Sequence, residues 1–262
     1  MLRYLRLYLA FVRFSFSRAM EFRVDFFFRF VMDVVFYATQ LAFFSVLYRH
    51  TDLVGGWDLE QIFIFVSGFF LVDALHMTIF ASNMWWLPMM VNKGDLDYYL
   101  VRPVSSLFFL SLRDFAANSF LNVVIAFGIC TWALSSYSEA VGIGRIGLYF
   151  LFLFNGAFLY YVIHLCFLIP VFWMHSGRGL GELFFAVEKY GERPERIFGG
   201  WLRRVLVSVL PFSLIASVPA EVLIDGFDWG ILRHVALVTG GCFGFLVLFW
   251  GRALRAYSSA SS

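Results

Sequence analysis

Four ionisable side chains lie inside long apolar runs of this sequence, where they could bind a substrate or transfer a proton. They are Asp33, Asp73, His76 and His164. A charge at the centre of a bilayer costs roughly 2.5–3.5 kcal/mol on insertion scales, so each of these groups needs a partner or a wet cavity. Asp73 and His76 are three residues apart and share one helix face. Two interpretations stay open: hydrogen bonding to a neighbouring helix or, for Asp73, His76 and His164, a place on a translocation path.

No catalytic constellation accompanies these residues. The motifs GxxxxGK[ST], HExxH, CxxC and GxSxG do not occur, and the five histidines are scattered. The three cysteines, Cys130, Cys166 and Cys242, lie far apart within apolar runs, which is typical of buried hydrophobic residues rather than of disulfides or a metal site. We therefore expect no enzymatic activity, no metal or other cofactor bound by this chain, and no nucleic-acid partner.

The elements that position these residues must be membrane helices. The chain of 262 residues is 61% hydrophobic and 15% charged, whereas soluble domains are about 45–50% apolar and about 25% charged. A bilayer is crossed by about 20 apolar residues, and backbone groups cannot remain unpaired in lipid, so runs of this length are helices. The expected fold is an all-α polytopic membrane protein with six transmembrane helices, at residues 24–48, 60–84, 107–135, 146–174, 201–220 and 231–251. Pro211 and Pro219 predict that the fifth of these is kinked or broken.

Residues 1–22 differ from the spans that follow. Arginines interrupt the apolar residues throughout this segment, which favours an amphipathic helix lying in the membrane interface against lipid headgroups. The alternative is a simple extension of the first span. The transmembrane domain then covers residues 23–256, and residues 257–262 form a disordered tail.

The distribution of basic residues predicts the orientation of the spans. Seventeen of the 20 lysines and arginines fall on one side, and Arg49, Arg145 and Arg233 on the other. Since cytoplasmic loops carry the excess of Lys and Arg, both termini are expected in the cytoplasm, with cytoplasmic loops at about 85–106 and 175–200.

The first cytoplasmic loop predicts a short helix. Gly94 ends the preceding helix and Asp95 caps a new one, in which Leu96, Tyr99 and Leu100 share one face. Two roles stay open from the residues alone: an element on which a cytoplasmic motor could push, or a helix that seals the bundle against headgroups. After the second loop, Trp201, Arg203 and Arg204 are expected to anchor the chain at the interface where it re-enters the membrane.

Residues 94–104 (GDLDYYLVRPV), 201–206 (WLRRVL), Pro211 and residues 218–221 (VPAE) resemble the paired signatures of a largely uncharacterised bacterial subfamily of type-2 ATP-binding-cassette (ABC) exporter permeases. The resemblance covers essentially the whole chain. It implies a permease subunit in a bacterial cytoplasmic (inner) membrane, paired with a second permease, identical or homologous. It also implies two copies of a cytoplasmic ABC ATPase, in which ATP and Mg are bound.

In such exporters the N-terminal interfacial helix and the first cytoplasmic loop receive the ATPase stroke, and the path lies between the two permeases. By this resemblance the ATPase-coupling residues are Gly94, Asp95, Leu96, Asp97, Tyr99, Leu100, Arg102 and Pro103. The expected function is outward movement of an amphipathic substrate that is lipid-like, peptide or drug-like. The alternative is a membrane scaffold that binds a cytoplasmic partner without transport; a lipid transferase is disfavoured because no acid, base or metal cluster is present.

Overall fold

The computed structural model describes residues 2–19, 23–174 and 177–258, and these residues form helices and turns without a β-strand. The all-α prediction is confirmed. The helices are α1 (Leu2–Ala19), α2 (Arg23–Leu47), α3 (Leu59–His76), the π-helical turn η1 (Met77–Ala81), α4 (Ser82–Lys93), α5 (Asp97–Leu100), α6 (Ser106–Leu112), η2 (Ala117–Ser119), α7 (Phe120–Ser136), α8 (Ile143–Leu168), α9 (Val171–Met174), α10 (Arg178–Glu188), η3 (Glu195–Ile197), α11 (Gly200–Ser208), α12 (Ser213–Ile224) and α13 (Trp229–Ala256).

Among the described residues, five segments are long and apolar enough to cross a bilayer, and a bent helix pair is either a broken sixth span or a re-entrant loop. The chain is therefore a polytopic membrane protein. The segments are Phe30–Leu47, Leu59–Lys93, Ala117–Ser136, Ile143–Met174 and Trp229–Ala256, with the pair Gly200–Ser208 and Ser213–Ile224.

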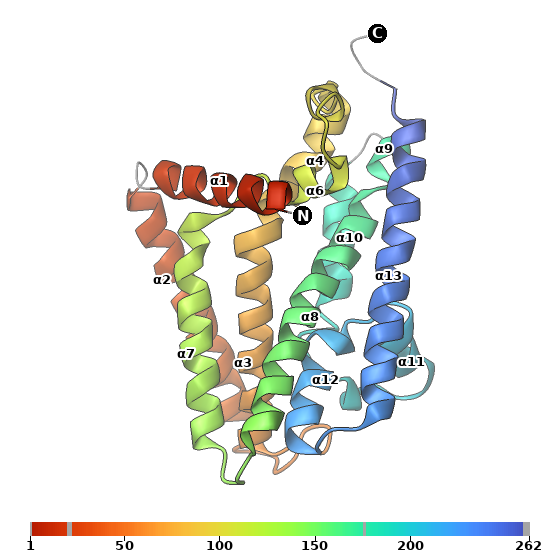
Figure 1. Cartoon of the computed structure of the whole chain (residues 1–262). Helices are drawn as coiled ribbons and strands as arrows, with labels where there is room; N and C mark the ends of the chain where they lie inside the picture. The colour runs from red at the N-terminus through yellow and green to blue at the C-terminus, as the bar shows by residue number, and fades with distance from the viewer. Residues whose placement is uncertain (1, 20–22, 175–176, 259–262) are drawn as a thin grey trace.

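The bundle has two distinct ends (Figure 1). Both termini lie at one end, which we call the termini end, and α1 lies across the bundle there. The connections 48–58, 137–142 and 225–228 lie at the opposite end, which we call the far end. At the C-terminus, the Tyr257 ring packs 6.0 Å from that of Phe172; residues 259–262 of the predicted tail lie outside the described residues, as do residues 20–22 at the end of the predicted interfacial segment.

Local signals fix where the second span begins and ends. Asp58 and Gln61 form a capping box: the Asp58 carboxylate accepts from the Gln61 backbone N–H at 2.9 Å, and the Gln61 side chain accepts from the Asp58 N–H at 3.2 Å. Gly94 ends α4 in the left-handed conformation, with φ 79°, as its sequence position predicts.

The core of the bundle forms where α12 packs on α8. A Cβ added to Gly156 would lie 2.3 Å from the Ile215 carbonyl oxygen, so only glycine permits this approach of the two backbones. A second apolar cluster, nearer the termini end, joins α4, α8 and α13 around Leu87, Leu165 and Leu246.

The third predicted span is shorter than expected. The sequence predicts a helix over residues 107–135, but the helix breaks after α6, and η2 with α7 alone crosses the bundle. The break is held by hydrogen bonds from other elements: the Ala116 N–H donates to the Thr78 carbonyl at 2.8 Å, and the Asp114 N–H donates to Asn83 at 3.0 Å. The continuous apolar run predicted unbroken helical hydrogen bonding, but at this break hydrogen bonds to other elements take its place.

The fifth predicted span and its preceding loop are also arranged differently. Residues 201–220 fall in α11 and α12, which meet at 95° around Pro211, so the predicted kink or break is confirmed. Because α11 follows η3 at the far end and α12 also ends there (Figure 1), the pair is a re-entrant loop and not the predicted fifth span. The sequence predicts that residues 175–200 form a loop on the same side as the termini. This prediction is wrong for the second half of that range, which lies at the far end. Helix α10 enters the bundle along α8, and η3 lies against Trp57 at the far end. This segment crosses the bundle, but hydropathy does not indicate a span here because α10 is amphipathic and the residues that follow it are polar.

Candidate functional site

The second span changes helical type directly after His76. There α3 gives way to the π turn η1, which inserts one additional residue before α4 resumes the α-helix. Such turns are frequent at functional sites because they re-aim the side chains around them. This one lies where the span contacts η2.

His76 and His164 meet in the interior. Nε2 of His76 lies 3.1 Å from Nδ1 of His164, and the side chains are only 1% and 2% exposed. The His76 ring stacks on Tyr160 at 4.2 Å between centroids, and the His164 ring stacks on Phe184 at 4.0 Å. Because one nitrogen must donate and the other accept, at least one ring is neutral in this arrangement.

Glu188 joins this cluster, and the sequence analysis missed it. Its side chain is buried at the end of α10, and its Oε1 accepts a hydrogen bond from the Tyr160 hydroxyl. A signal was present: Leu180, Phe184 and Glu188 are spaced by four residues, and the first two are buried. That spacing places Glu188 on the buried face of the helix.

Asp73 faces a different environment from the histidine pair. Together with Asp33 and Tyr37 it lines a cavity of about 850 Å³ between α2, α3 and α7. The structure therefore brings two of the three predicted path residues, His76 and His164, into contact and places the third, Asp73, on a neighbouring cavity.

The predicted coupling helix exists as a single turn, α5. The prediction that Asp95 caps it is wrong, because Leu96 occupies the N-cap position and no side chain caps the turn. The backbone at Leu96 is already right-handed helical, with φ −61° and ψ −30°, whereas a side-chain cap needs an extended N-cap residue. Asp97 lies in the first turn of α5, where a carboxylate is favoured.

Residues 94–103, which we call the coupling segment after their predicted role, have an apolar face that is only partly buried. Leu96 is fully buried and Tyr99 packs against the cluster around Leu87, while Leu100 is 36% exposed. On the other side, Tyr98 and Val101 are 72% and 82% exposed. The segment is thus seated on the bundle and presents a projecting apolar surface at the termini end.

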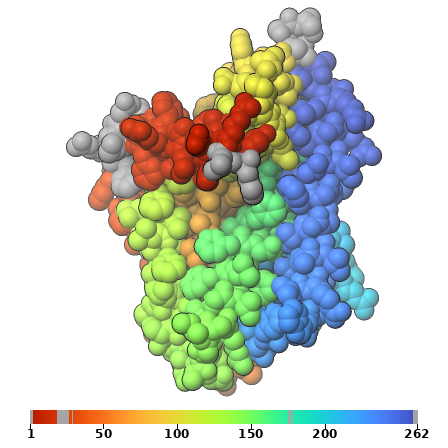
Figure 2. Space-filling model, in the orientation of Figure 1, coloured from red at the N-terminus to blue at the C-terminus, as the bar shows by residue number. Residues whose placement is uncertain are grey.

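Helix α1, red in Figure 2, lies beside the yellow region of the chain that includes the coupling segment, and both contact α6. The Phe109 ring lies 5.5 Å from the Tyr99 ring and 5.3 Å from the Phe11 ring of α1. The Ser105 N–H donates to the Tyr4 hydroxyl at 3.2 Å. These contacts join α1 and α5 to the same short helix.

Arg102 and Pro103 end the coupling segment beside α1. They line a pocket of about 410 Å³ together with Arg3 and Arg6. The Arg102 guanidinium lies 5.2 Å from the centroid of the Phe109 ring, a cation–π contact.

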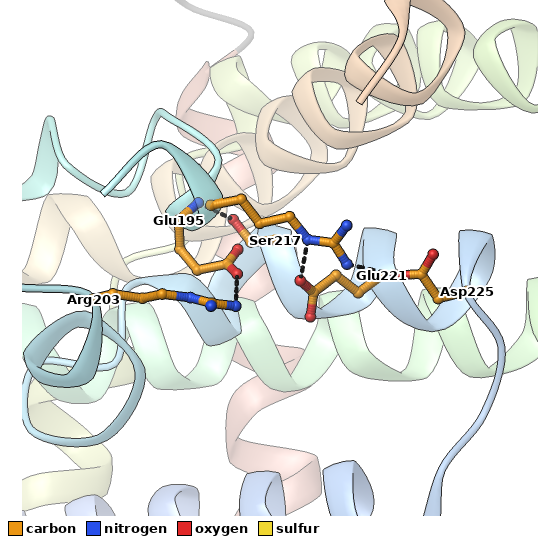
Figure 3. A network of polar contacts seen from close by, with 6 residues as sticks. Glu195, Arg203, Ser217, Glu221 and Asp225 are labelled. Carbon is orange, nitrogen blue, oxygen red and sulfur yellow. Dashed lines mark hydrogen bonds and ion pairs between the residues drawn. The ribbon is translucent and has the colours of Figure 1, made fainter. Parts of the chain in front are cut away.

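A polar network at the far end holds η3 to α12 (Figure 3). Nε of Arg196 donates to Glu221 at 2.9 Å, and its terminal nitrogen lies 2.5 Å from the Asp225 carboxylate. The same guanidinium lies 5.3 Å from the centroid of the Trp57 ring. Burial lowers the pKa of Arg196, but its hydrogen bonds to the two carboxylates outweigh that effect and raise the pKa above its ordinary value.

The predicted anchors lie on α11. Arg203 donates to Glu195 at 3.0 Å, and the Glu195 side chain is only 3% exposed. The Glu195 N–H in turn donates to Ser217 of α12 at 3.4 Å (Figure 3). Trp201, 73% exposed, and Arg204 lie on the surface of α11.

The described chain is an all-helical polytopic membrane protein with an irregular second span, a buried polar cluster and a predicted coupling segment exposed at one end. The model of the ABC-2 family transporter proteins matches residues 34–261, and the chain belongs to this family. It is a membrane permease of an ABC transporter and works with an ABC ATPase subunit. The match begins within α2 and does not include α1. No curated protein and no solved structure matches the chain.

Proposed function

We propose that this permease exports an amphipathic substrate across a bacterial inner membrane, driven by two copies of a cytoplasmic ATPase and paired with a second permease, identical or homologous. In this proposal the termini end faces the cytoplasm. The observation that carries it is the coupling segment, whose exposed Tyr98 and Val101 stand on the buried Leu96.

The distribution of basic residues supports this orientation less strongly than the sequence suggested. Residues 189–204, which carry five lysines and arginines, run from the interior of the bundle to the far end and along α11. The sequence predicts 17 of the 20 basic residues on the side of the termini. Without these five, 12 of the 17 remain at the termini end. The excess keeps its sign, so the positive-inside rule still favours cytoplasmic termini.

The proposed stroke passes through the coupling segment into the second span. Pressure on α5 moves α6 through the contact of Tyr99 with Phe109, and α6 carries α1 with it. The second span is the element that yields, because its π turn interrupts regular helical bonding next to His76. Tilting of α4 against α3 would then exchange inward for outward access.

The proposed path runs along the faces of α3, α8 and α10 that carry polar groups. His76, His164 and Glu188 come from these three different helices and meet within the bundle. Polar groups buried in a membrane are costly and mark ion or substrate pathways. Movement of α10 relative to α3 would open this cluster to a headgroup.

Reconstitution with the partner ATPase tests the proposal. Tyr98→Ala with Val101→Ala should abolish substrate-stimulated ATP hydrolysis and export while the permease still folds, because both side chains are exposed. The matched control is Leu53→Ala with Ile143→Ala, which removes two apolar side chains that are 59% and 89% exposed at the far end. Undiminished hydrolysis and export in the first variant would overturn the coupling role.

A further inference from the structure

A basic pocket of about 410 Å³ lies at the termini end, between α1 and the end of the coupling segment. Arg3, Arg6 and Leu7 line it from α1, and Arg102 and Pro103 line it from the coupling segment. Neither histidine of the proposed path lines this pocket. A ligand held here is therefore bound outside that path, as a partner of the permease and not as its cargo.

The described lining of this pocket carries positive charge only. Its three ionisable residues are arginines, whose guanidinium groups stay protonated in proteins. Among the described residues no carboxylate pairs with Arg3, Arg6 or Arg102. The carboxylates of the coupling segment, Asp95 and Asp97, do not line the pocket. The three cations therefore repel one another and favour an anion between them.

The Arg102 guanidinium is held in place while its terminal nitrogens stay available to a ligand. Its Nε donates to the Tyr98 carbonyl oxygen at 3.3 Å, and its Cζ lies 5.2 Å from the centroid of the Phe109 ring. Within the described part of the chain, neither terminal nitrogen of Arg102 has a hydrogen-bond partner. Guanidinium groups bind phosphate through two parallel N–H···O hydrogen bonds, so phosphate is the anion that complements this arrangement.

The position of α1 indicates which phosphate reaches the pocket. The helix lies across the bundle at the termini end (Figure 1), and its Leu5 and Leu9 side chains are 56% and 57% exposed. A helix that carries both arginines and exposed apolar side chains lies in the headgroup layer of a bilayer. Anionic lipids present their phosphates at that depth and attract basic residues there.

We propose that this pocket binds the headgroup phosphate of an anionic phospholipid, which joins Arg3 and Arg6 of α1 to Arg102 of the coupling segment. Binding itself requires neither the ATPase nor transport. Only its effect on coupling rests on the proposed function: the bound lipid would fasten α1 to the segment that receives the stroke, so anionic lipid should increase coupling.

Native mass spectrometry of the purified permease in a nonionic detergent tests the proposal. Dioleoyl-phosphatidylglycerol is the anionic probe, and dioleoyl-phosphatidylcholine, with the same chains and a zwitterionic headgroup, is the reference. Arg3→Gln combined with Arg6→Gln and Arg102→Gln should weaken the first phosphatidylglycerol binding step about tenfold or more and leave phosphatidylcholine binding unchanged. All three arginines are exposed, so this variant should fold. Arg3→Gln with Arg6→Gln alone keeps the contact of Arg102 with Phe109 and should show an intermediate loss.

The matched control removes three exposed arginines of α1 and α13 that do not line the pocket: Arg13→Gln, Arg252→Gln and Arg255→Gln. It changes the net charge by the same amount and should bind phosphatidylglycerol as the wild type does. An equal loss in the control and in the pocket variant would overturn the inference. Unchanged phosphatidylglycerol binding in the pocket variant would also overturn it, and if that variant no longer bound the ATPase, the pocket would belong to an acidic surface of the ATPase.

A competition experiment separates the lipid from soluble phosphates. Glycerophosphoglycerol, the same headgroup without acyl chains, should displace the lipid about tenfold or more weakly, because it buries no apolar chain. Equally effective competition would overturn the assignment to a lipid. Conversely, failure of ATP-driven export with intact phosphatidylglycerol binding would overturn the proposed function and leave this inference standing.

Discussion

The Asn83 side chain holds the backbone of Asp114 at both of its polar groups. Its Nδ2 donates to the Asp114 carbonyl at 2.8 Å, and its Oδ1 accepts from the Asp114 N–H at 3.0 Å. The Asp114 carboxylate in turn pairs with Arg18 of α1 at 2.5 Å. Helix α1 is thereby tied to the second span two residues after the π segment ends, which gives the proposed stroke a second route into that span.

Replacing Asn83 by alanine should destabilise the permease by about 1–3 kcal/mol. The variant removes the fully buried Asn83 amide and leaves the partly buried backbone N–H and carbonyl of Asp114 without their partners. Thermal unfolding in detergent measures the loss. Arg18→Ala is the matched comparison at the other side of Asp114, and it should cost less than about 1 kcal/mol, because Arg18 is 53% exposed. Equal effects of the two variants would argue against this division of roles.

The histidine pair should behave as one unit. His76→Phe and His164→Phe preserve ring stacking, but each leaves the remaining histidine with an unpaired buried nitrogen, at about 1–3 kcal/mol. The double variant removes both partners and should be more stable than the sum of the single effects predicts. Additive losses in a double-mutant cycle of unfolding free energies would show that the two rings do not interact.

Glu188 should tolerate glutamine better than leucine. Glutamine retains an oxygen that accepts from the Tyr160 hydroxyl, whereas leucine leaves that buried hydroxyl unpaired at about 1–3 kcal/mol. Unfolding temperatures of the two variants provide the comparison. Glu182→Leu serves as the control, because Glu182 lies near the start of the same helix; it should differ little from wild type. If Glu188→Gln lowered the unfolding temperature as much as Glu188→Leu does, the charge itself would be required.

Arg196 should contribute more to the stability of the far end than either of its carboxylate partners does. Arg196→Ala removes two ion pairs and the contact with Trp57, and we expect a loss of about 2–3 kcal/mol. Asp225→Ala should cost under about 1 kcal/mol, because this carboxylate is 55% exposed. Limited proteolysis of the η3 segment provides the measurement. Equal protection of wild type and Arg196→Ala would exclude a structural role for the network.

The sequence predicts those features that depend on apolar length or a single strong local signal. Span length identified α2, α8 and α13, and Gly94 marked the end of α4. The sequence also grouped His76 and His164 with Asp73 as possible path residues, although the direct contact of the two histidines depends on how α3 packs against α8.

Features created by tertiary partners could not be predicted in this way. The π turn and the break before α7 are held by hydrogen bonds between residues more than 30 positions apart, such as those of Asn83 with Asp114. Residues 178–199 cross the bundle despite their charges, because those charges find partners such as Tyr160 for Glu188 and Glu221 for Arg196. A hydropathy average assigns such a segment to solvent, because it scores each residue alone and takes no account of its tertiary partners.

The orientation of the bundle is tested most directly by labelling single cysteines with a membrane-impermeant maleimide, in a variant that lacks the three native cysteines. Val101→Cys reports the coupling segment, while Leu53→Cys and Ile197→Cys report the far end; all three positions are exposed. We predict that intact cells are labelled at residues 53 and 197, and at residue 101 only after permeabilisation. Labelling of residue 101 in intact cells, or residue 197 behaving like residue 101, would contradict the account.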